Sequence, residues 1–318
     1  MKLLGDLPRV EPDLKPSFEP LTVDSLLSPE RAAPSWPISN LLPPGLTILA
    51  GAPKVGKSWL ALQIARSVAT GEPLFGEPVT QGPILYLALE DTPARLKDRT
   101  DRQSWPAGVP AHFLFLPHIQ SQFNNLRGDG ANRLVSFIID GGYRLVVIDT
   151  LNRFLLSMQN QFALVSNTLS LFQLIAIRLH GAVILIDHHR KLSSADAITD
   201  ILGSAYKGAV ADTAFGLYHQ RGKQGARLRV TGRDVPERTL ALQMDWSSFC
   251  FQLLGEADEL DLTARQQELL EALKELQRAT LADLVRAVGQ DRSNTHKRLQ
   301  DMVNEGLIRR DGEYYTLH

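Results

Sequence analysis

The stretch Gly51-Ala52-Pro53-Lys54-Val55-Gly56-Lys57-Ser58 decides the fold, because it fits the pattern G-x-x-x-x-G-K-[ST]. An apolar run at 46–50, typical of a buried strand, comes directly before it, and a helix-like stretch at 59–69 follows it. Glycines let backbone N–H groups turn inward around phosphate oxygens at a helix N-terminus. The lysine of such a loop reaches the β and γ phosphates, and its last hydroxyl binds Mg²⁺. We therefore expect these residues, with Trp59, to bind a nucleoside triphosphate, and Ser58 to bind Mg²⁺.

Outward from the loop, short apolar runs at 84–89, 113–116, 145–148 and 183–186 alternate with helix-like stretches. Continuous apolar strands that alternate with helices predict a parallel sheet covered on both faces. Four hairpin-like strands follow between 213 and 254, and they are expected to extend the sheet as an antiparallel edge. The fold class is therefore α/β, with a core over residues 41–255.

Two strand ends carry carboxylates that suit phosphate chemistry. Asp149 ends an apolar strand, where an acid can hold the Mg²⁺ shell; capping of the next loop is the alternative. Glu90 ends the strand 84–89 and is the candidate for orienting the attacking water, with a cap or ion pair as the alternative. Asp91 is expected to cap the helix at 92–102.

A pair of histidines, His188 and His189, follows the strand 183–186. Polar groups at that place can contact the γ-phosphate. When the phosphate is lost, the loss of this contact can change the conformation of the loops that follow. A metal site is a weak interpretation, because adjacent histidines rarely face one ion and Mg²⁺ prefers oxygen. The pair is thus a candidate phosphate sensor, with a structural or DNA-loop role as the alternative.

Composition and charge narrow the class of protein. The 318 residues carry a net charge of −1, which excludes a globally basic nucleic-acid binder, and the single cysteine cannot form an internal disulfide. Because the start does not fit a signal peptide and no apolar run is long enough for a membrane span, we expect a cytoplasmic protein. Nine of the 18 prolines precede residue 45, so residues 1–40 are expected to form an extended arm. This arm is either a disordered tail or a strap on a neighbouring subunit.

The C-terminal part predicts a second, smaller domain. An acidic linker is expected at 256–262, followed over 263–318 by three helices and a hairpin around Asp311-Gly312. That order is typical of a winged helix-turn-helix. Lys297 and Arg298 on its third helix are candidate DNA contacts, but residues 263–318 hold nine basic and nine acidic residues. Duplex DNA and a protein partner both remain open as its target.

Residues 221–238 form a locally basic segment with a net charge of +4. It is predicted to form mobile hairpin loops that contact the DNA backbone, reach a neighbouring subunit, or both. A solvated surface hairpin is the alternative. Its candidate DNA contacts are Arg221, Lys223, Arg227 and Arg229.

Taken together, the motifs resemble a known family. Besides the phosphate loop they are Leu85-Tyr-Leu-Ala-Leu-Glu-Asp, Val147-Ile-Asp-Thr, His188-His-Arg-Lys and Gly203-Ser204. Over residues 36–255 the chain is similar to the RepA-like branch of the RecA/DnaB-type ATPases of plasmids, phages and integrated elements. The resemblance implies a RecA fold, a homo-oligomeric ring (commonly a hexamer) with ATP between subunits, and single-stranded DNA in its channel.

The resemblance also assigns roles to residues. It implies that Lys57 and Ser58 contact phosphate and Mg²⁺, that Glu90 activates water, that Asp149 holds the metal shell, and that the His188-His189 position senses the γ-phosphate. Such rings need a basic finger that reaches the neighbour's nucleotide. Relatives can carry Arg just before the Gly-Ser pair, where this chain has Leu202. The remaining candidates are Lys207, Arg229 and Arg233.

Three functions follow as hypotheses. The first is an ATP-dependent, ring-forming helicase that moves on single-stranded DNA during replication of a mobile element. The second is a DNA-bound regulator or loader, in which ATP binding switches assembly and hydrolysis is weak. The third, a RecA-type recombinase, is disfavoured because no N-terminal DNA-binding domain is evident.

Overall fold

The computed structural model describes residues 21–28, 35–126, 129–157, 163–188, 205–219 and 225–317. The chain divides into two compact units, one up to Leu254 and one from Gly255. No helix among the described residues is both long and apolar enough to cross a membrane.

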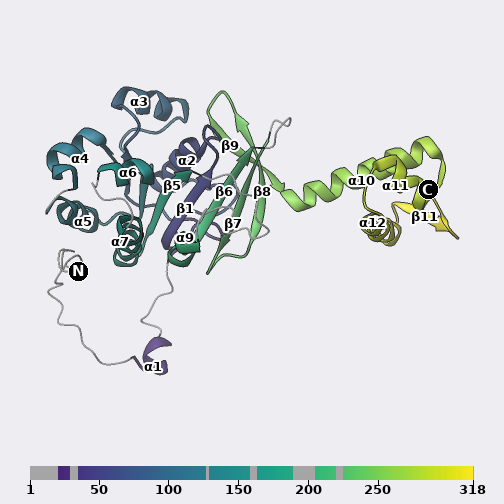
Figure 1. Ribbon diagram of the computed structural model, residues 1–318, viewed down its shortest axis with the longest axis horizontal. Helices are drawn as coiled ribbons and strands as arrows, with labels where there is room; N and C mark the ends of the chain where they lie inside the picture. The colour runs from purple at the N-terminus through teal and green to yellow at the C-terminus, as the bar shows by residue number, and fades with distance from the viewer. Residues whose placement is uncertain are drawn as a thin grey trace. The chain divides into compact units, whose positions relative to one another are not determined.

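The first unit is built on a nine-stranded sheet in the order β3-β2-β4-β5-β1-β6-β7-β8-β9 (Figure 1). Its first six strands in this order pair in parallel: β3 (Ala111–Phe115), β2 (Ile84–Ala88), β4 (Leu145–Asp149), β5 (Ala182–His188), β1 (Gly45–Gly51) and β6 (Thr213–His219). The strands β7 (Ala226–Gly232) and β8 (Arg238–Asp245) continue the sheet antiparallel, and β9 (Cys250–Glu256) follows at its edge. The predicted mainly parallel α/β sheet with an antiparallel edge is confirmed.

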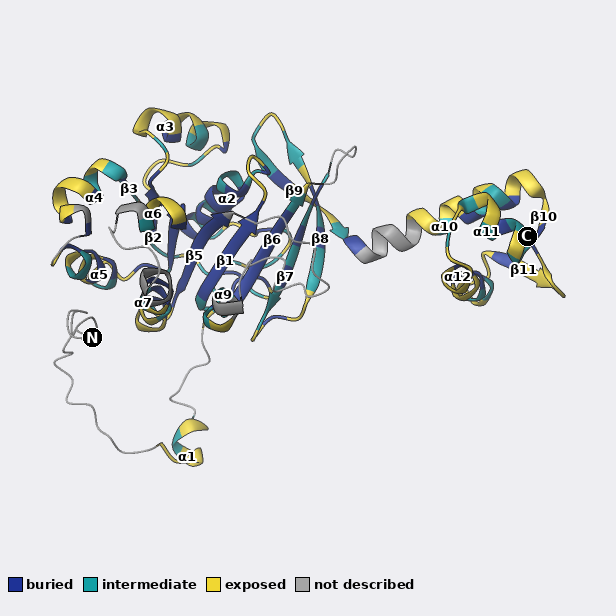
Figure 2. Cartoon of the chain, in the orientation of Figure 1, coloured by how far each residue is buried: buried dark blue, intermediate teal, exposed yellow. Residues whose placement is uncertain are grey.

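Both faces of the sheet are covered, and the central strands are buried from end to end (Figure 2). One face packs against α2 (Lys57–Thr70) and receives Leu96 from α3 (Pro93–Arg102). The other face packs against α5 (Gly130–Asp140), α7 (Ala163–Leu179) and shorter elements. These shorter elements are α4 (Leu116–Gln122), the 3-10 turn η1 (Asn124–Leu126) and α6 (Leu151–Ser157), and α9 (Ala205–Val210) precedes β6. Because both faces of the sheet are covered, side chains on both sides of each central strand are buried. This explains why these strands appear in the sequence as continuous apolar runs.

The N-terminal boundary of this unit differs from the predicted one at residue 41. Ile38, Leu41 and Leu42 are fully buried, and Ile38 forms isolated bridges with Leu42 and Val79. The prolines around Ile38 favour an extended backbone, but an extended segment can still bury its side chains. Residues 35–40 therefore belong to the packed unit and not to the arm. Upstream, the arm contains the short helix α1 (Val23–Leu26), capped by Thr22.

The second unit has its own core and its own three-stranded sheet. It contains α10 (Ala257–Leu276), β10 (Arg278–Thr280), α11 (Leu281–Val288), α12 (Arg292–Asn304), β11 (Ile308–Asp311) and β12 (Tyr314–Leu317). The sheet order is β10-β12-β11, with both pairs antiparallel. The predicted small helix-turn-helix domain with a hairpin is confirmed.

The predicted linker at 256–262 is wrong in its conformation. Helix α10 begins at Ala257, so the acidic run lies in its first two turns. Carboxylates near a helix N-terminus interact favourably with the unpaired N–H groups and the helix dipole. An acidic run directly before a helical pattern is therefore as compatible with helix as with linker.

Candidate functional site

The phosphate loop joins the end of β1 to the start of α2, and its two glycines occupy positions where a side chain does not fit. Gly56 has φ of 101°, and an added Cβ would lie 2.9 Å from Cζ of Phe251. At Gly51 an added Cβ would lie 2.5 Å from the carbonyl oxygen of Leu217. Gly56 also supplies no side-chain cap to α2, so the helix N-terminus keeps its N–H groups for a ligand.

Lys57 is the first residue of α2 and only 6% exposed. Its Nζ donates hydrogen bonds of 2.9 Å to the carbonyl oxygens of Gly51 and Ala52. Burial lowers the pKa of Lys57, and the nearby carboxylates of Asp149, Asp187 and Glu90 act in the opposite direction. A buried ammonium held inside a loop at a helix N-terminus fits the charge of a triphosphate.

Asp149 ends β4 and is 4% exposed. Its Oδ2 accepts a 2.8 Å hydrogen bond from the buried Tyr86 hydroxyl, and Ser58 donates another. Burial raises the pKa of Asp149, and these two hydrogen bonds partly counteract the rise. A carboxylate and a hydroxyl at hydrogen-bond distance form an oxygen donor set that suits Mg²⁺. The residues that would hold the ion are therefore the two that the sequence predicts.

Glu90 follows β2 and is exposed at the edge of the sheet where Asp149 lies, since Ala88 pairs with Asp149 in the neighbouring strand. The Thr150 hydroxyl donates a 2.7 Å hydrogen bond to Oε1 of Glu90. Thr150 is a site residue that sequence reasoning missed. Its place directly after a strand-terminal aspartate was the available signal.

The expected capping role of Asp91 is wrong. The Thr92 side chain caps α3 by accepting from the backbone N–H of Arg95. The Asp91 carboxylate instead accepts hydrogen bonds from the side chains of Arg95 at 3.3 Å and Arg99 at 2.5 Å. Proline at the start of α3 leaves the cap to the residue directly before it.

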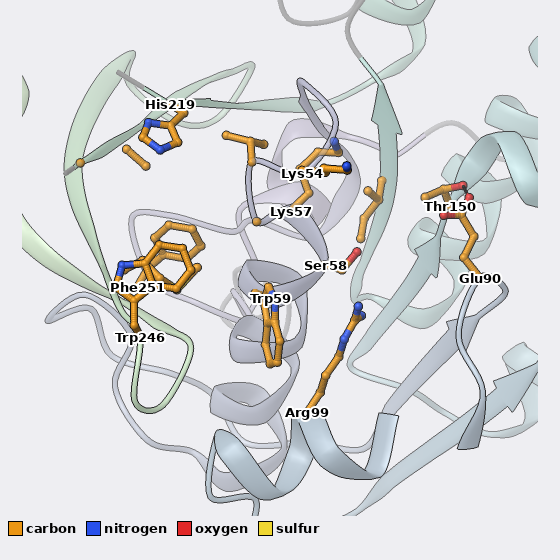
Figure 3. Close-up of a pocket in the computed structure, with 16 residues that line it drawn as sticks. Lys54, Lys57, Ser58, Trp59, Glu90, Arg99, Thr150, His219, Trp246 and Phe251 are labelled. Carbon is orange, nitrogen blue, oxygen red and sulfur yellow. Dashed lines mark hydrogen bonds between the residues drawn. The ribbon is translucent and has the colours of Figure 1, made fainter. Parts of the chain in front are cut away.

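Several of these groups line one cavity of about 650 Å³ (Figure 3). Its lining includes Lys57, Ser58, Glu90 and Thr150 on one side and aromatic side chains on the other. The motifs did not predict several lining residues, which come from α3, from the end of β6 and from the antiparallel edge: Arg99, His219, Met244, Trp246 and Phe251. Arginine on a helix and aromatics on edge strands have no fixed spacing to the phosphate loop, so the sequence offers no pattern for them.

Of the predicted phosphate-sensor pair His188 and His189, the structure describes only the backbone of His188. His188 ends β5, where its backbone pairs in register with Gly51 of the phosphate loop. Its side chain and the whole of His189 lie outside the described residues.

The three candidate trans fingers each form an ion pair within their own chain. Lys207 on α9 pairs with Asp187, and Arg229 on β7 pairs with Glu237 at 2.5 Å. Arg233 pairs with Asp212 at 3.2 Å and donates to the carbonyl oxygen of Ala209 at 2.9 Å. All three therefore have partners in the isolated subunit.

The structure describes some of the candidate DNA contacts and not others. Arg221 and Lys223 lie outside the described residues, and Arg227 is partly buried on β7. Lys297 is exposed on α12. Arg298 was expected beside it as a DNA contact, but it is only 9% exposed and donates a 3.0 Å hydrogen bond to Oε1 of Gln290. It lies on the same helix face as buried Thr295 and Met302, so the helical period turns it into the core.

Known proteins are similar to this chain at the level of solved structures and of family models. Similar solved structures include an ATPase domain, at 15% identity over 67% of this chain and 85% of that chain, with a TM-score of 0.49. A KaiC-like protein from the hyperthermophilic archaeon Pyrococcus horikoshii OT3 is 13% identical over 68% of this chain and 91% of that chain, with a TM-score of 0.47. The family model of the IclR helix-turn-helix domain matches residues 264–312, and that of the AAA domain matches residues 12–194. Because the AAA match spans more than half of the chain and contains the phosphate loop, the chain belongs to the AAA domain family of P-loop ATPases.

Proposed function

We propose that the protein is an ATP-hydrolysing DNA motor that works as a homo-oligomeric ring, in the manner of the RepA-like replicative helicases that its motifs resemble. The observation that carries this proposal is the position of Glu90. Its carboxylate is exposed at the carboxyl edge of the sheet, fixed by Thr150, and lines the same cavity as Lys57 and Ser58. A site that only bound the nucleotide would not need a carboxylate there.

The residues of the site divide the work of hydrolysis. Lys57 would bind the β and γ phosphates in place of its two loop carbonyls. Ser58 and Asp149 would hold Mg²⁺, which when bound neutralises charge on the phosphates. Glu90 would orient a water molecule and accept its proton, with Thr150 fixing the carboxylate.

The DNA-binding part of the proposal rests on two separate surfaces. In helix-turn-helix domains the second helix of the motif enters the major groove; here that helix is α12, the third of the unit, and it carries exposed Lys297. In the core, the basic segment 221–238 would contact single-stranded DNA inside the ring.

The test is ATP hydrolysis by the full chain with and without single-stranded DNA, in the presence of Mg²⁺. We expect stimulation by DNA in the wild type, none in Glu90→Gln, and full retention of ATP binding in that variant. Lys57→Ala serves as the control that loses binding as well. Normal turnover in Glu90→Gln would remove Glu90 from the mechanism, and wild-type turnover indifferent to DNA would reject the motor.

A second candidate function is an ATP-switched regulator or loader with weak hydrolysis. The observation that favours it is that Lys207, Arg229 and Arg233 are all engaged within their own subunit. Mixing wild-type protein with each alanine variant at these positions separates the two. A motor requires that one variant reduces the turnover of its wild-type neighbours more than in proportion to its share, whereas a regulator shows proportional loss.

A further inference from the structure

One wall of the nucleotide cavity is formed by the turn between β8 and β9, and it presents an exposed indole. Trp246 lines the cavity together with Met244 and Phe251, yet 71% of its surface is exposed (Figure 3). An indole exposed at the rim of a cavity offers a flat apolar surface that a ligand in the cavity can cover.

The turn that carries Trp246 is held in one conformation. The Asp245 carboxylate accepts hydrogen bonds from the Ser247 backbone N–H at 2.9 Å and from the Ser247 and Ser248 hydroxyls at 2.7 and 2.8 Å. These bonds lower the pKa of Asp245 to about 2, so the carboxylate stays ionised at any working pH. The Trp246 and Phe249 rings form a T-shaped pair, with the centroids 5.8 Å apart.

The same turn is fastened to the helix that begins at the phosphate loop. The Gln63 side chain exchanges two hydrogen bonds with the Phe251 backbone, at 2.9 and 2.8 Å. Buried Gln103 donates to the carbonyl oxygens of Trp59 and Phe249, at 3.0 and 3.2 Å. Trp246 is therefore placed at a set position relative to Lys57, as a platform for a group attached to the phosphates must be.

The other tryptophan in the cavity wall, Trp59, is already engaged. Its ring stacks on Phe249 with centroids 4.5 Å apart, and the Arg99 guanidinium lies over it at 5.1 Å. Trp59 thus packs against Phe249 in the turn between β8 and β9. The exposed ring of Trp246 is available to a ligand.

We propose that Trp246 is the stacking platform for the base of the bound nucleoside triphosphate, and that it favours purine over pyrimidine nucleotides. This inference rests on the proposed function, since it assumes that the phosphates bind at Lys57. A flat base gains contact in proportion to its ring area, so the larger purine gains more than the pyrimidine from the same indole.

The experiment measures equilibrium binding of ATP, CTP and inorganic tripolyphosphate to the full chain with Mg²⁺, by calorimetry. We expect Trp246→Ala to weaken ATP binding roughly tenfold, to leave tripolyphosphate binding unchanged, and to reduce the preference for ATP over CTP. Trp246→Phe should recover most of the affinity for ATP. Leu254→Ala, on β9 and 52% exposed, is the control that should change none of these values.

Three results would overturn the inference. Equal losses of ATP and tripolyphosphate binding in Trp246→Ala would mean that the turn only supports the phosphate loop. Unchanged ATP binding with weaker binding of single-stranded oligonucleotide would assign Trp246 to DNA. If wild-type protein binds neither ATP nor tripolyphosphate, the proposed function fails with the inference. If the wild type binds both ligands and Lys57→Ala loses both, the phosphate site stands and the first two results concern Trp246 alone.

Discussion

The hydroxyl of Thr150 donates a 2.7 Å hydrogen bond to the carboxylate of Glu90 across the ends of two neighbouring parallel strands. The bond fixes one carboxylate oxygen and leaves the other oxygen to the cavity. Thr150 lies directly after Asp149, so a single strand end would hold the metal ligand and orient the residue that positions water. This coupling makes Thr150 a positioning residue whose removal should affect the rate more than binding.

Thr150→Val is expected to lower kcat roughly tenfold with little change in KM, because one hydrogen bond to a charged group is lost without loss of a phosphate contact. Thr150→Ser keeps the hydroxyl and should retain most of the activity. Steady-state ATP hydrolysis measures both. Full activity in Thr150→Val together with a loss in Thr150→Ser would show that the methyl group, and not the hydrogen bond, is what matters.

Asp149→Asn should make the protein more stable while abolishing Mg²⁺-dependent turnover. Burial raises the folded-state pKa of Asp149 above its ordinary value of 3.8. The unfavourable contribution of a raised carboxyl pKa is absent below the unfolded-state pKa and grows as pH rises above it. Thermal unfolding without nucleotide should therefore show a higher Tm for the variant at pH 7, and the difference should vanish near pH 4. A lower Tm at pH 7 would contradict this assignment.

Gly56→Ala should destabilise the first unit by about 2 kcal/mol or more, because its φ of 101° is strained for alanine and its Cβ would press on Phe251. Gly76→Ala is the matched control, since its φ is 82° and no atom lies within 4 Å of the added Cβ. The control should cost about 1 kcal/mol and leave ATP binding intact. Denaturant unfolding together with ATP binding distinguishes the two, and equal losses would refute the role of the contact.

In the second unit, substitution of Lys297 should affect DNA binding, whereas substitution of its neighbour Arg298 should affect stability. Lys297→Ala should weaken duplex DNA binding and reduce the slope of log affinity against log salt by about 1, without lowering Tm. Arg298→Ala should instead destabilise the unit by about 1–3 kcal/mol, because it removes a buried side chain and its bond to Gln290. Binding across a salt series and calorimetric unfolding of the full chain test both. Binding lost in Arg298→Ala at unchanged stability would restore it as a DNA contact.

The sequence predicts the parts of this protein that depend on local pattern. The phosphate loop, the buried strands and the hairpin around Asp311-Gly312 follow from spacing, apolar runs and turn chemistry, and the structure places them as expected. The contact of Thr150 with Glu90 and the place of Trp246 in the cavity wall could not be found in this way, because they depend on which strands are neighbours in the sheet. Arg298 was assigned to the wrong helix face because a basic residue beside Lys297 suits DNA, whereas the helical period decides its direction.

The strand order places the proposed phosphate site and Trp246 in different parts of the first unit. The groups proposed to contact the phosphates and Mg²⁺ lie at the start of α2 and at the ends of β2 and β4, next to the buried core of the sheet. Trp246 lies on a turn at the sheet margin, where substitution disturbs little of the core. In the proposed assignment, a substitution at Trp246 would therefore change nucleotide preference and leave hydrolysis to the residues beside the phosphate loop.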